Sequence, residues 1–308
     1  MNRKSTPIQR QAAEITRSAS KQTFFTIKFF ADQDLVGDAY CAYAYFRWVD
    51  DVLDGPTGSQ LEKRAFLQRQ MALLYGEQAD AIAPCPEEEM LLALVQTRPE
   101  RSSGLWSYLE NMMAVMEFDL ERRGQPVSQA ELDGYSHKLA VSVMDGLMYF
   151  IGHDQSAPNE PGKYDAVIGA HITHMLRDTS EDIEVGYFNI PNETLQQRHL
   201  SASDWNNLSY RTWVCRRVKL ARAYFNSGRE YIARIKPFRR RLAGFAYAAR
   251  FEWVLKTIER DSYCLRADYS QRKSIRAALT MVWSVLVSFL GNEDAHRGAN
   301  HSQLETFG

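Results

Sequence analysis

The sequence has few of the features that mark several common classes of protein. Its 308 residues include only four cysteines, and none of them forms a CxxC pair. We therefore predict neither a disulfide framework nor a cysteine-based zinc site, but free thiols in a reducing compartment. The formal net charge is −1, which provides no basic surface for nucleic acid. The first residues lack the apolar core of a signal peptide, so the expected location is cytoplasmic.

Long apolar runs and dinucleotide-binding loops are also missing. The most apolar run, residues 277–291, is shorter than the ~20 residues of a membrane-spanning helix, so we expect a buried helix over residues 274–290. No G-x-G-x-x-G loop is present, although a helical enzyme can bind NADPH without one, and NADPH is left open. Few stretches alternate polar and apolar residues as strands do, so the chain is predicted to be all-α.

Helical periodicity is what the sequence does contain. Residues 106–123 carry apolar side chains at helical spacing, a pattern that indicates core packing. Hydrophobic residues make up 45% of the chain, enough for a substantial core. Because the breaks between periodic segments are short, a single domain is predicted over residues 20–292. Residues 1–19 are expected to be a polar tail or a frayed helix, and residues 293–308 a polar tail.

The chemically most informative residues end a predicted helix over residues 39–54. Asp50 and Asp54 are four residues apart, so they share one face of that helix, with Arg47 at its border. Like charges at this spacing repel, and the C-terminal end of a helix disfavours anions, so we expect a cation between them. Carboxylate oxygens suit a hard ion such as Mg²⁺. The alternative is that these acids and Asp51 are ordinary surface residues near a helix end.

A second predicted helix, residues 163–185, repeats this arrangement. Asp178 and Asp182 are again four residues apart, and Arg177 is adjacent to the first of them. His174 lies on the same stripe, four residues before Asp178. The repetition of an arginine beside a spaced aspartate pair favours a metal site over two separate sets of surface acids.

The two motifs, Arg47-x-x-Asp-Asp-x-x-Asp54 and Arg177-Asp-x-x-x-Asp182-x-x-x-Gly186-x-x-x-Ile-Pro191, resemble the aspartate-rich motifs of the squalene/phytoene synthase family. The resemblance covers residues 20–290. It implies an isoprenoid synthase fold, which is a single all-helical bundle around a central cavity. It also implies that Mg²⁺ ions, held by both motifs, help to remove diphosphate from a prenyl substrate. Mn²⁺ is an alternative metal.

By position in these motifs, the resemblance implies a set of metal ligands and a set of diphosphate contacts. The implied metal ligands are Asp50, Asp51, Asp54, His174, Asp178 and Asp182. The expected catalytic residues among them are Asp50, Asp54, Asp178 and Asp182. The implied diphosphate contacts are Arg47, Arg177, Thr23, Phe24 and Arg266. Thr23 and Phe24 stand near the family's Ser-Phe pattern, and Arg266 lies close to a C-terminal arginine position that is Asp268 here.

His174 stands where the family usually has asparagine, and three alternatives remain open. His174 donates a hydrogen bond to diphosphate, it shifts the metal preference towards ions such as Mn²⁺, or it is a packed histidine without a role in the site. Two further departures concern the prenyl tail and the end of the second motif. Val141 and Met144 replace glycines that normally leave room for a prenyl chain, which predicts a narrowed or rerouted channel. Tyr187 and Asn189 replace an arginine and a tyrosine.

The leading functional prediction is the one that the resemblance implies: head-to-head condensation of two farnesyl or geranylgeranyl diphosphates. A terpene synthase that acts on one prenyl diphosphate is the second, because a narrowed channel has less room for another chain. A non-catalytic helical binding or assembly protein is the third, although such a protein has little physical reason to keep two acidic faces. Peripheral membrane contact would suit a lipid-soluble product, and no oligomeric state is predicted.

Overall fold

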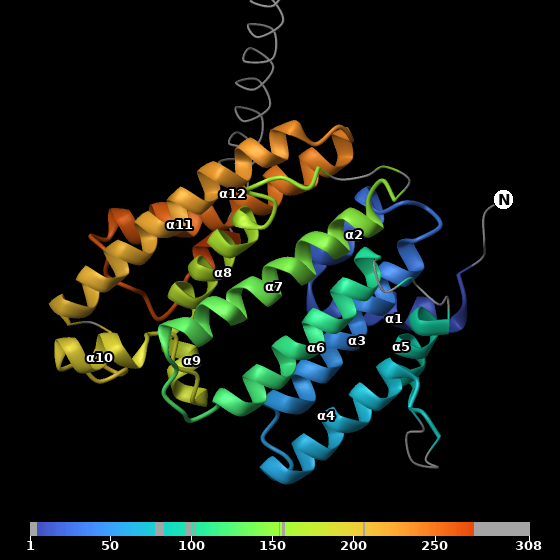
Figure 1. Cartoon of the computed structure of the whole chain (residues 1–308), viewed down its shortest axis with the longest axis horizontal. Coiled ribbons are helices and arrows are strands. Elements are labelled where there is room, and N and C mark those ends of the chain that lie inside the picture. The colour runs from blue at the N-terminus through green and yellow to red at the C-terminus, as the bar shows by residue number, and fades with distance from the viewer. Residues whose placement is uncertain are drawn as a thin grey trace, which may run out of the picture. The chain divides into compact units, whose positions relative to one another are not determined.

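A computed structural model of the chain describes residues 5–77, 83–96, 100, 103–153, 155, 158–205 and 207–273. All regular secondary structure in these ranges is helical, which confirms the all-α prediction (Figure 1). The elements are α1 Pro7–Ala19, α2 Lys21–Phe30, α3 Val36–Asp54, α4 Gln60–Tyr75, α5 Pro86–Gln96, α6 Gly104–Arg122, α7 Gln129–Phe150, α8 Asp165–Arg177, α9 Thr179–Val185, α10 Asn192–Arg198, α11 Leu208–Arg234, α12 Phe238–Arg260 and the 3₁₀-helix η1 Ser270–Lys273.

The helix predicted over residues 274–290 and the polar tail predicted over residues 293–308 lie outside the described residues. None of the helices that the structure describes combines the length and the apolar character needed to cross a membrane. The chain divides into two compact units. One consists of Met1–Pro126 with Ala130–Ser156, and the other of Val127–Gln129 with Ala157–Gly308. The range predicted as one domain, residues 20–292, therefore contributes helices to both units.

Helix α3 is the centre of the first unit. Its side chains Tyr45 and Val49 are fully buried, and α1, α2, α5 and α6 pack around it. Helices α3, α6 and α7 run side by side (Figure 1). Helices α6 and α7 approach closely at Gly104, where a Cβ atom would lie 2.5 Å from the carbonyl oxygen of Asp145. The first acidic motif is therefore carried by the most enclosed helix of this unit.

Residues 7–19, expected to be a tail or a frayed helix, form the capped helix α1. The Thr6 hydroxyl accepts a hydrogen bond from the Gln9 backbone at 3.2 Å, and the Gln9 side chain accepts one from the Thr6 backbone at 3.0 Å. Ala12 and Thr16 are fully buried, and α1 packs on α3. The Thr16 hydroxyl donates to the Ala12 carbonyl at 2.8 Å, which satisfies its polar group inside the protein. The polar composition of residues 7–19 therefore did not indicate that one face of this helix is buried.

A buried carboxylate connects three helices of the first unit. Glu88, in the first turn of α5, accepts hydrogen bonds from Arg69 Nε at 2.7 Å and Nη2 at 2.8 Å, and from Gln70 Nε2 at 2.8 Å. Tyr45 of α3 donates to Gln70 Oε1 at 3.1 Å. The hydrogen bonds from Arg69 lower the pKa of Glu88 to about 2, against the effect of burial.

Replacing Glu88 by glutamine is expected to lower the free energy of unfolding at neutral pH by about 3 kcal/mol, which corresponds to the pKa shift from 4.5 to about 2. Because the folded-state pKa is depressed, this stabilisation is complete above the unfolded-state pKa and is lost as the pH falls towards 2. Urea unfolding of both proteins at neutral and acidic pH measures the difference, which should shrink in acid. Glu89→Gln, at an exposed position of the same helix, should change stability by less than about 0.5 kcal/mol. An equal difference at both pH values would contradict the linkage.

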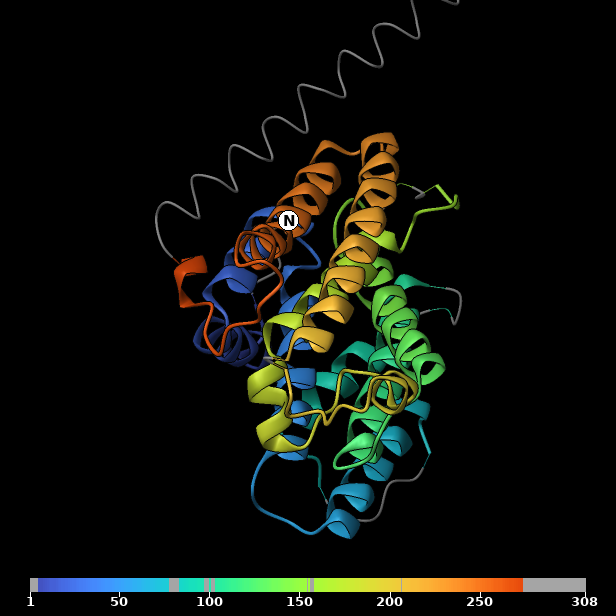
Figure 2. The ribbon, with the colours of Figure 1, turned by 90° about the vertical axis from the view of Figure 1, so that its left-hand side faces the viewer.

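In the second unit, α8 packs against both α11 and α12. Figure 2 shows α11 and α12 side by side, and Arg222 of α11 donates to Glu259 of α12 at 3.1 and 2.8 Å. Gly228 allows α11 to approach α8, because a Cβ atom there would lie 2.4 Å from the Ala166 backbone nitrogen. The helix that carries the second acidic motif is thus held by close backbone packing.

The helix predicted over residues 163–185 is divided in two at Asp178. The backbone of Asp178 has φ −97° and ψ 8°, and it separates α8 from α9. The Thr179 hydroxyl donates to the Met175 carbonyl at 2.8 Å, a side-chain hydrogen bond of the kind that bends helices. The Asp182 backbone still donates to the Asp178 carbonyl at 2.8 Å. The two aspartates therefore remain one helical turn apart across the bend.

Candidate active site

The first acidic face lies at the C-terminal end of α3. Arg47 Nη1 is 3.3 Å from Asp50 Oδ2, and the same guanidinium pairs with both carboxylate oxygens of Asp51, with Nε 3.2 Å from Oδ2. Burial raises the pKa of Asp50 to about 6, the negative charge of Asp54 adds to the shift, and Arg47 opposes it. Asp50 and Asp54 thus lie close enough for their negative charges to repel one another.

Asp119 of α6 adds a third carboxylate to this region, because its charge also raises the pKa of Asp50. Asp119 accepts hydrogen bonds from Arg122 Nε at 2.7 Å and from the Tyr135 hydroxyl of α7 at 2.9 Å. Burial raises the pKa of Asp119, while Arg122 and Tyr135 oppose the shift. The Arg122 guanidinium also lies 5.0 Å from the centre of the Tyr135 ring. These contacts fix the ends of α6 and α7 nearest the acidic face.

The second acidic face surrounds the bend between α8 and α9. Arg177 donates to both carboxylate oxygens of Asp178, with Nε 2.5 Å from Oδ1. His174 Nε2 lies 2.8 Å from Asp178 Oδ2. Burial would raise the pKa of Asp178, but the hydrogen bonds and charges of Arg177 and His174 outweigh it and hold the pKa well below its usual range. Asp178 therefore remains ionised at neutral pH.

Asp182 is held by the segment that follows α9. Asn189 Nδ2 donates to Asp182 Oδ2 at 2.5 Å. Gly186 adopts the left-handed conformation, with φ 93°, and the Tyr187 backbone donates to the Asp182 carbonyl at 2.7 Å. This turn brings Asn189 back to Asp182. The residue that replaces a tyrosine of the family pattern thus orients one of the predicted metal ligands.

The remaining predicted diphosphate contacts have local partners. Thr23 Oγ1 donates to Ser20 Oγ at 2.9 Å, and the Phe24 ring stacks on Tyr40 with centroids 5.3 Å apart. Arg266 donates to Asp261 from Nε at 2.5 Å and from Nη2 at 3.0 Å, just after α12. Within the described residues, no group of three or more His, Cys, Asp or Glu side chains is arranged to hold a metal ion. Each acidic face instead offers a pair of aspartates.

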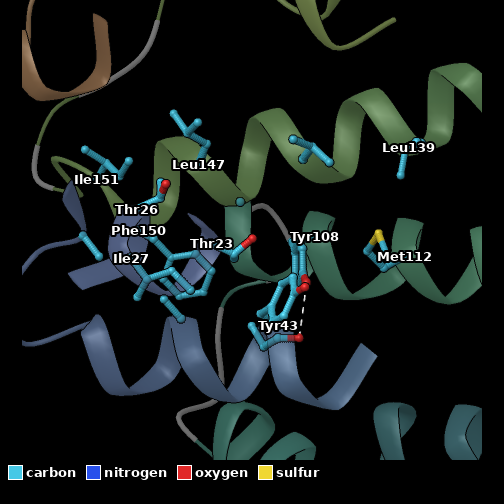
Figure 3. Close-up of a pocket in the computed structure, with 15 residues that line it drawn as sticks. Thr23, Thr26, Ile27, Tyr43, Tyr108, Met112, Leu139, Leu147, Phe150 and Ile151 are labelled. Carbon is cyan, nitrogen blue, oxygen red and sulfur yellow. Dashed lines mark hydrogen bonds between the residues drawn. The ribbon is translucent and has the colours of Figure 1, made fainter. Parts of the chain in front are cut away.

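An apolar cavity of about 340 Å³ lies inside the first unit, between α2, α3, α6 and α7 (Figure 3). Its lining consists of Thr23, Thr26, Ile27, Ala31, Ala39, Ala42, Tyr43, Tyr108, Met112, Leu139, Val143, Gly146, Leu147, Phe150 and Ile151. Almost all of these side chains are hydrocarbon or aromatic, so the cavity suits an apolar ligand. Val141 and Met144 are not in this lining, so the narrowing predicted from them does not fall on this cavity.

A model of the family described as squalene/phytoene synthase matches residues 16–281. The chain belongs to the squalene/phytoene synthase family. Members of this family are prenyltransferases that act on prenyl diphosphates. The resemblance predicted from the two aspartate motifs is confirmed.

Similarity to individual squalene/phytoene synthase family proteins is low but extends along the chain. The chain is 28% identical over 164 residues to presqualene diphosphate synthase of Zymomonas mobilis, a match that covers 51% of this chain and 52% of that protein. It is 25% identical over 237 residues to 15-cis-phytoene synthase of Synechocystis, covering 70% and 67% respectively. The chain thus spans about half the length of the first relative.

Two solved structures share the fold of this squalene/phytoene synthase family member. Squalene synthase HpnC from Alicyclobacillus acidocaldarius has a TM-score of 0.67 at 19% identity, covering 85% of this chain and 98% of that one. A dehydrosqualene synthase in complex with ligand has a TM-score of 0.68 at 16% identity, covering 92% and 96%. At these identities the likeness concerns the fold alone.

Two residues of the acidic faces in this squalene/phytoene synthase family member escaped the sequence analysis. Asp119 lies three residues after Met116 and seven after Met112, so it interrupts an otherwise apolar stripe. An acidic residue on such an apolar stripe could have identified Asp119 as a candidate site residue from the sequence. Asn189 carried no comparable signal, because its contact with Asp182 depends on the turn at Gly186.

Proposed function

We propose that this protein is a Mg²⁺-dependent enzyme that condenses two prenyl diphosphates, of the farnesyl or geranylgeranyl class, head to head. Family membership and one observation within the first unit support the proposal. On α3, Tyr43 of the cavity precedes Asp50 by seven residues, and on α6, Met112 precedes Asp119 by the same number. Seven residues correspond to about 10 Å of helix. An acidic end and an apolar cavity at this separation match a ligand with a charged head and an apolar tail.

The two acidic faces would hold divalent ions on the diphosphate, with Asp50 and Asp54 on α3 and with Asp178 and Asp182 at the α8–α9 bend. Mg²⁺ is normally held by one or two carboxylates, and phosphate oxygens and waters complete its shell. Pairs of aspartates therefore fit this metal. When bound, Mg²⁺ supplies Lewis-acid stabilisation of the departing diphosphate. Asp51, which is paired with Arg47, is an additional candidate ligand.

The arginines of both motifs would bind phosphate oxygens. Arg47 pairs with Asp51, and Arg177 pairs with Asp178. A guanidinium has five N–H donors in a planar fork, so each arginine can hold its carboxylate and still donate to a phosphate. Lysine would not provide this bidentate geometry. Thr23 and Phe24, beside the cavity, and Arg266 are further proposed contacts of the diphosphate.

The cavity would protect the cation that remains after diphosphate departs. An allylic cation reacts readily with water, so the apolar walls serve to exclude it. Two of the lining residues, Tyr43 and Tyr108, are aromatic and lie next to one another (Figure 3). A cation over an aromatic ring is stabilised by ~0.5–2 kcal/mol. The same cavity would hold the hydrocarbon tail by burial of apolar surface.

Product analysis tests the proposed function. The protein is incubated with Mg²⁺ and with C10, C15 or C20 prenyl diphosphates, and both diphosphate and hydrocarbons are measured. A C30 or C40 product supports head-to-head condensation. A C15 or C20 olefin or alcohol would instead identify a terpene synthase acting on one substrate. No diphosphate release with any chain length or metal would refute the proposal and leave a binding or assembly role.

His174→Asn tests the role of the histidine. Half of its side chain is exposed, at 51%, and its Nε2 contacts Asp178, so a role through Asp178 is favoured over core packing. A hydrogen bond to a charged group contributes about 1.5–3 kcal/mol, so we expect at least a ~10-fold change in turnover or in the Mg²⁺ concentration required. The ratio of rates with Mg²⁺ and Mn²⁺ should rise, because imidazole is the poorer ligand for Mg²⁺. Unchanged rates and metal preference would exclude a site role.

A further inference from the structure

One aromatic ring in the wall of the apolar cavity packs against α7 at a position where that helix has no side chain. Tyr108 of α6, labelled in Figure 3, lies against Gly146 of α7, and both residues line the cavity. A Cβ atom on Gly146 would lie 2.8 Å from Cδ2 and 3.2 Å from Cγ of the Tyr108 ring. Any other residue at 146 would therefore displace the ring. The glycine is what allows Tyr108 to occupy this place.

The Tyr108 ring is fixed from several sides. Its hydroxyl donates to the Ala42 carbonyl of α3 at 3.2 Å. Burial raises the pKa of Tyr108 above its usual value, so the hydroxyl stays protonated as this hydrogen bond requires. The ring meets Phe46 and Phe150 edge to face, with centroids 5.4 and 6.4 Å apart. A side chain held by α3, α6 and α7 together forms a rigid part of the wall.

Tyr108 and Gly146 stand at the same depth from the acidic face. Tyr108 precedes Asp119 by eleven residues on α6, and Gly146 follows Tyr135 by eleven residues on α7. Both intervals correspond to about 16 Å of helix, measured from the hydrogen bond between Asp119 and Tyr135. Met112, Leu139 and Val143 line the cavity before this level. Leu147, Phe150 and Ile151 line it beyond.

This depth separates two prenyl chain lengths. An extended chain advances about 1.2 Å per bond, so a farnesyl chain of eleven main-chain bonds spans about 13 Å and a geranylgeranyl chain of fifteen about 18 Å. The Tyr108 hydroxyl meets Ala42, which precedes Asp50 by eight residues, or about 12 Å of helix, so a farnesyl tail whose head lies at the acidic face ends at the ring. A geranylgeranyl tail must pass it.

We propose that Tyr108, seated against Gly146, is the residue that limits the prenyl tail in this cavity to the farnesyl length. The proposal rests on the proposed function and deepens it by naming the substrate length. Tyr108 acts as a specificity-determining residue, and it takes no part in the chemistry. Gly146 acts only through the position of the ring.

Binding measurements with non-ionisable substrates test this inference. Farnesyl and geranylgeranyl thiolodiphosphates are titrated calorimetrically into the full chain with Mg²⁺, and farnesol and geranylgeraniol are titrated without metal. The wild-type protein should bind the C15 ligand of each pair at least tenfold more tightly. Tyr108→Leu should remove this preference by strengthening C20 binding about tenfold. An unchanged C15 to C20 ratio in folded Tyr108→Leu would overturn the inference.

Further variants distinguish an effect of the position of the Tyr108 ring from a general loss of packing in the cavity. Gly146→Ala should push the ring into the cavity and weaken C15 binding at least tenfold, whereas the same change in a Tyr108→Leu background should have little effect. Equal losses in both backgrounds would refute a role through Tyr108. Tyr149→Leu is the matched control, because Tyr149 lies on α7 with Gly146 but outside the cavity lining. This variant should keep the wild-type ratio of C15 to C20 affinity.

The prenyl alcohols distinguish failure of this inference from failure of the proposed function. Alcohol binding with the expected C15 preference, but without diphosphate release from any substrate, would refute the enzymatic proposal and support the length limit. Diphosphate release with equal use of C15 and C20 chains by wild type and Tyr108→Leu would refute the length limit alone.

Discussion

Alanine at Asp50 or at Asp178 is expected to lower turnover at least ~100-fold. Under the proposed function, each substitution would remove a metal ligand from one acidic face, and a 100-fold loss corresponds to about 2.7 kcal/mol of activation free energy. Asp50 sits in a region where neighbouring carboxylates repel it, and Asp178 is kept ionised by Arg177 and His174. Under the proposed function, both carboxylates would bind a cation.

Steady-state rates over a range of Mg²⁺ concentrations measure this effect. The loss should appear in kcat and in the Mg²⁺ requirement together, because the missing ligand acts through the metal. Glu181→Ala is the matched control: Glu181 is an exposed acid of α9 adjacent to Asp182, and its loss should change turnover less than about twofold. Retained turnover in either aspartate variant would refute the proposed use of both acidic faces.

Alanine at Asp119 is expected to lower the free energy of unfolding by about 3 kcal/mol. Arg122 is 8% exposed and its Nε donates to Asp119, so removal of the carboxylate takes an anionic partner from a buried guanidinium. Breaking a buried ion pair from one side destabilises proteins by about 3–5 kcal/mol, and the remaining exposure of Asp119 places this case at the low end. The Tyr135 hydroxyl loses its acceptor as well.

Denaturant unfolding of Asp119→Ala, Asp119→Asn and Tyr135→Phe tests this prediction. Asparagine keeps an acceptor for Arg122 and should recover part of the loss. Tyr135→Phe removes a single hydrogen bond and should lower stability by only about 1 kcal/mol. If alanine were no more destabilising than the phenylalanine variant, the ion pair with Arg122 would not be what stabilises the ends of α6 and α7.

Both aspartate motifs could be predicted from sequence because they depend on short intervals. Four residues place Asp50 and Asp54 on one face of a helix whatever surrounds it, and a regular helix turn gave Asp178 and Asp182 the same relation. The bend at Asp178 was not predicted, since it follows from side-chain hydrogen bonds at Thr179. Even so, the backbone hydrogen bond across the bend preserved the predicted spacing.

Contacts between distant segments could not be predicted in the same way. Asp119 accepts a hydrogen bond from Tyr135 across the α6–α7 turn. Glu88 of α5 accepts hydrogen bonds from side chains of α4, and no local sequence pattern indicates this contact. Helix α1 shows the same limit, because its polar residues concealed the buried Ala12 and Thr16. In each case the residue or helix that makes the contact is distant in sequence, and composition does not indicate which helices pack together.

By itself, the amino-acid sequence determined the all-helical class, the C-terminal ends of the two motif segments at Asp54 and Val185, and the spacing of one helical turn within each aspartate pair. These are properties of one or two helical turns, where spacing alone decides which side chains are neighbours. Tertiary structure alone decided which apolar side chains line the cavity and that Tyr108 packs against Gly146 in its wall. The reason is physical: a hydrophobic stripe specifies that a helix face is buried, but the depth and shape of the space left between faces depend on how four helices pack together.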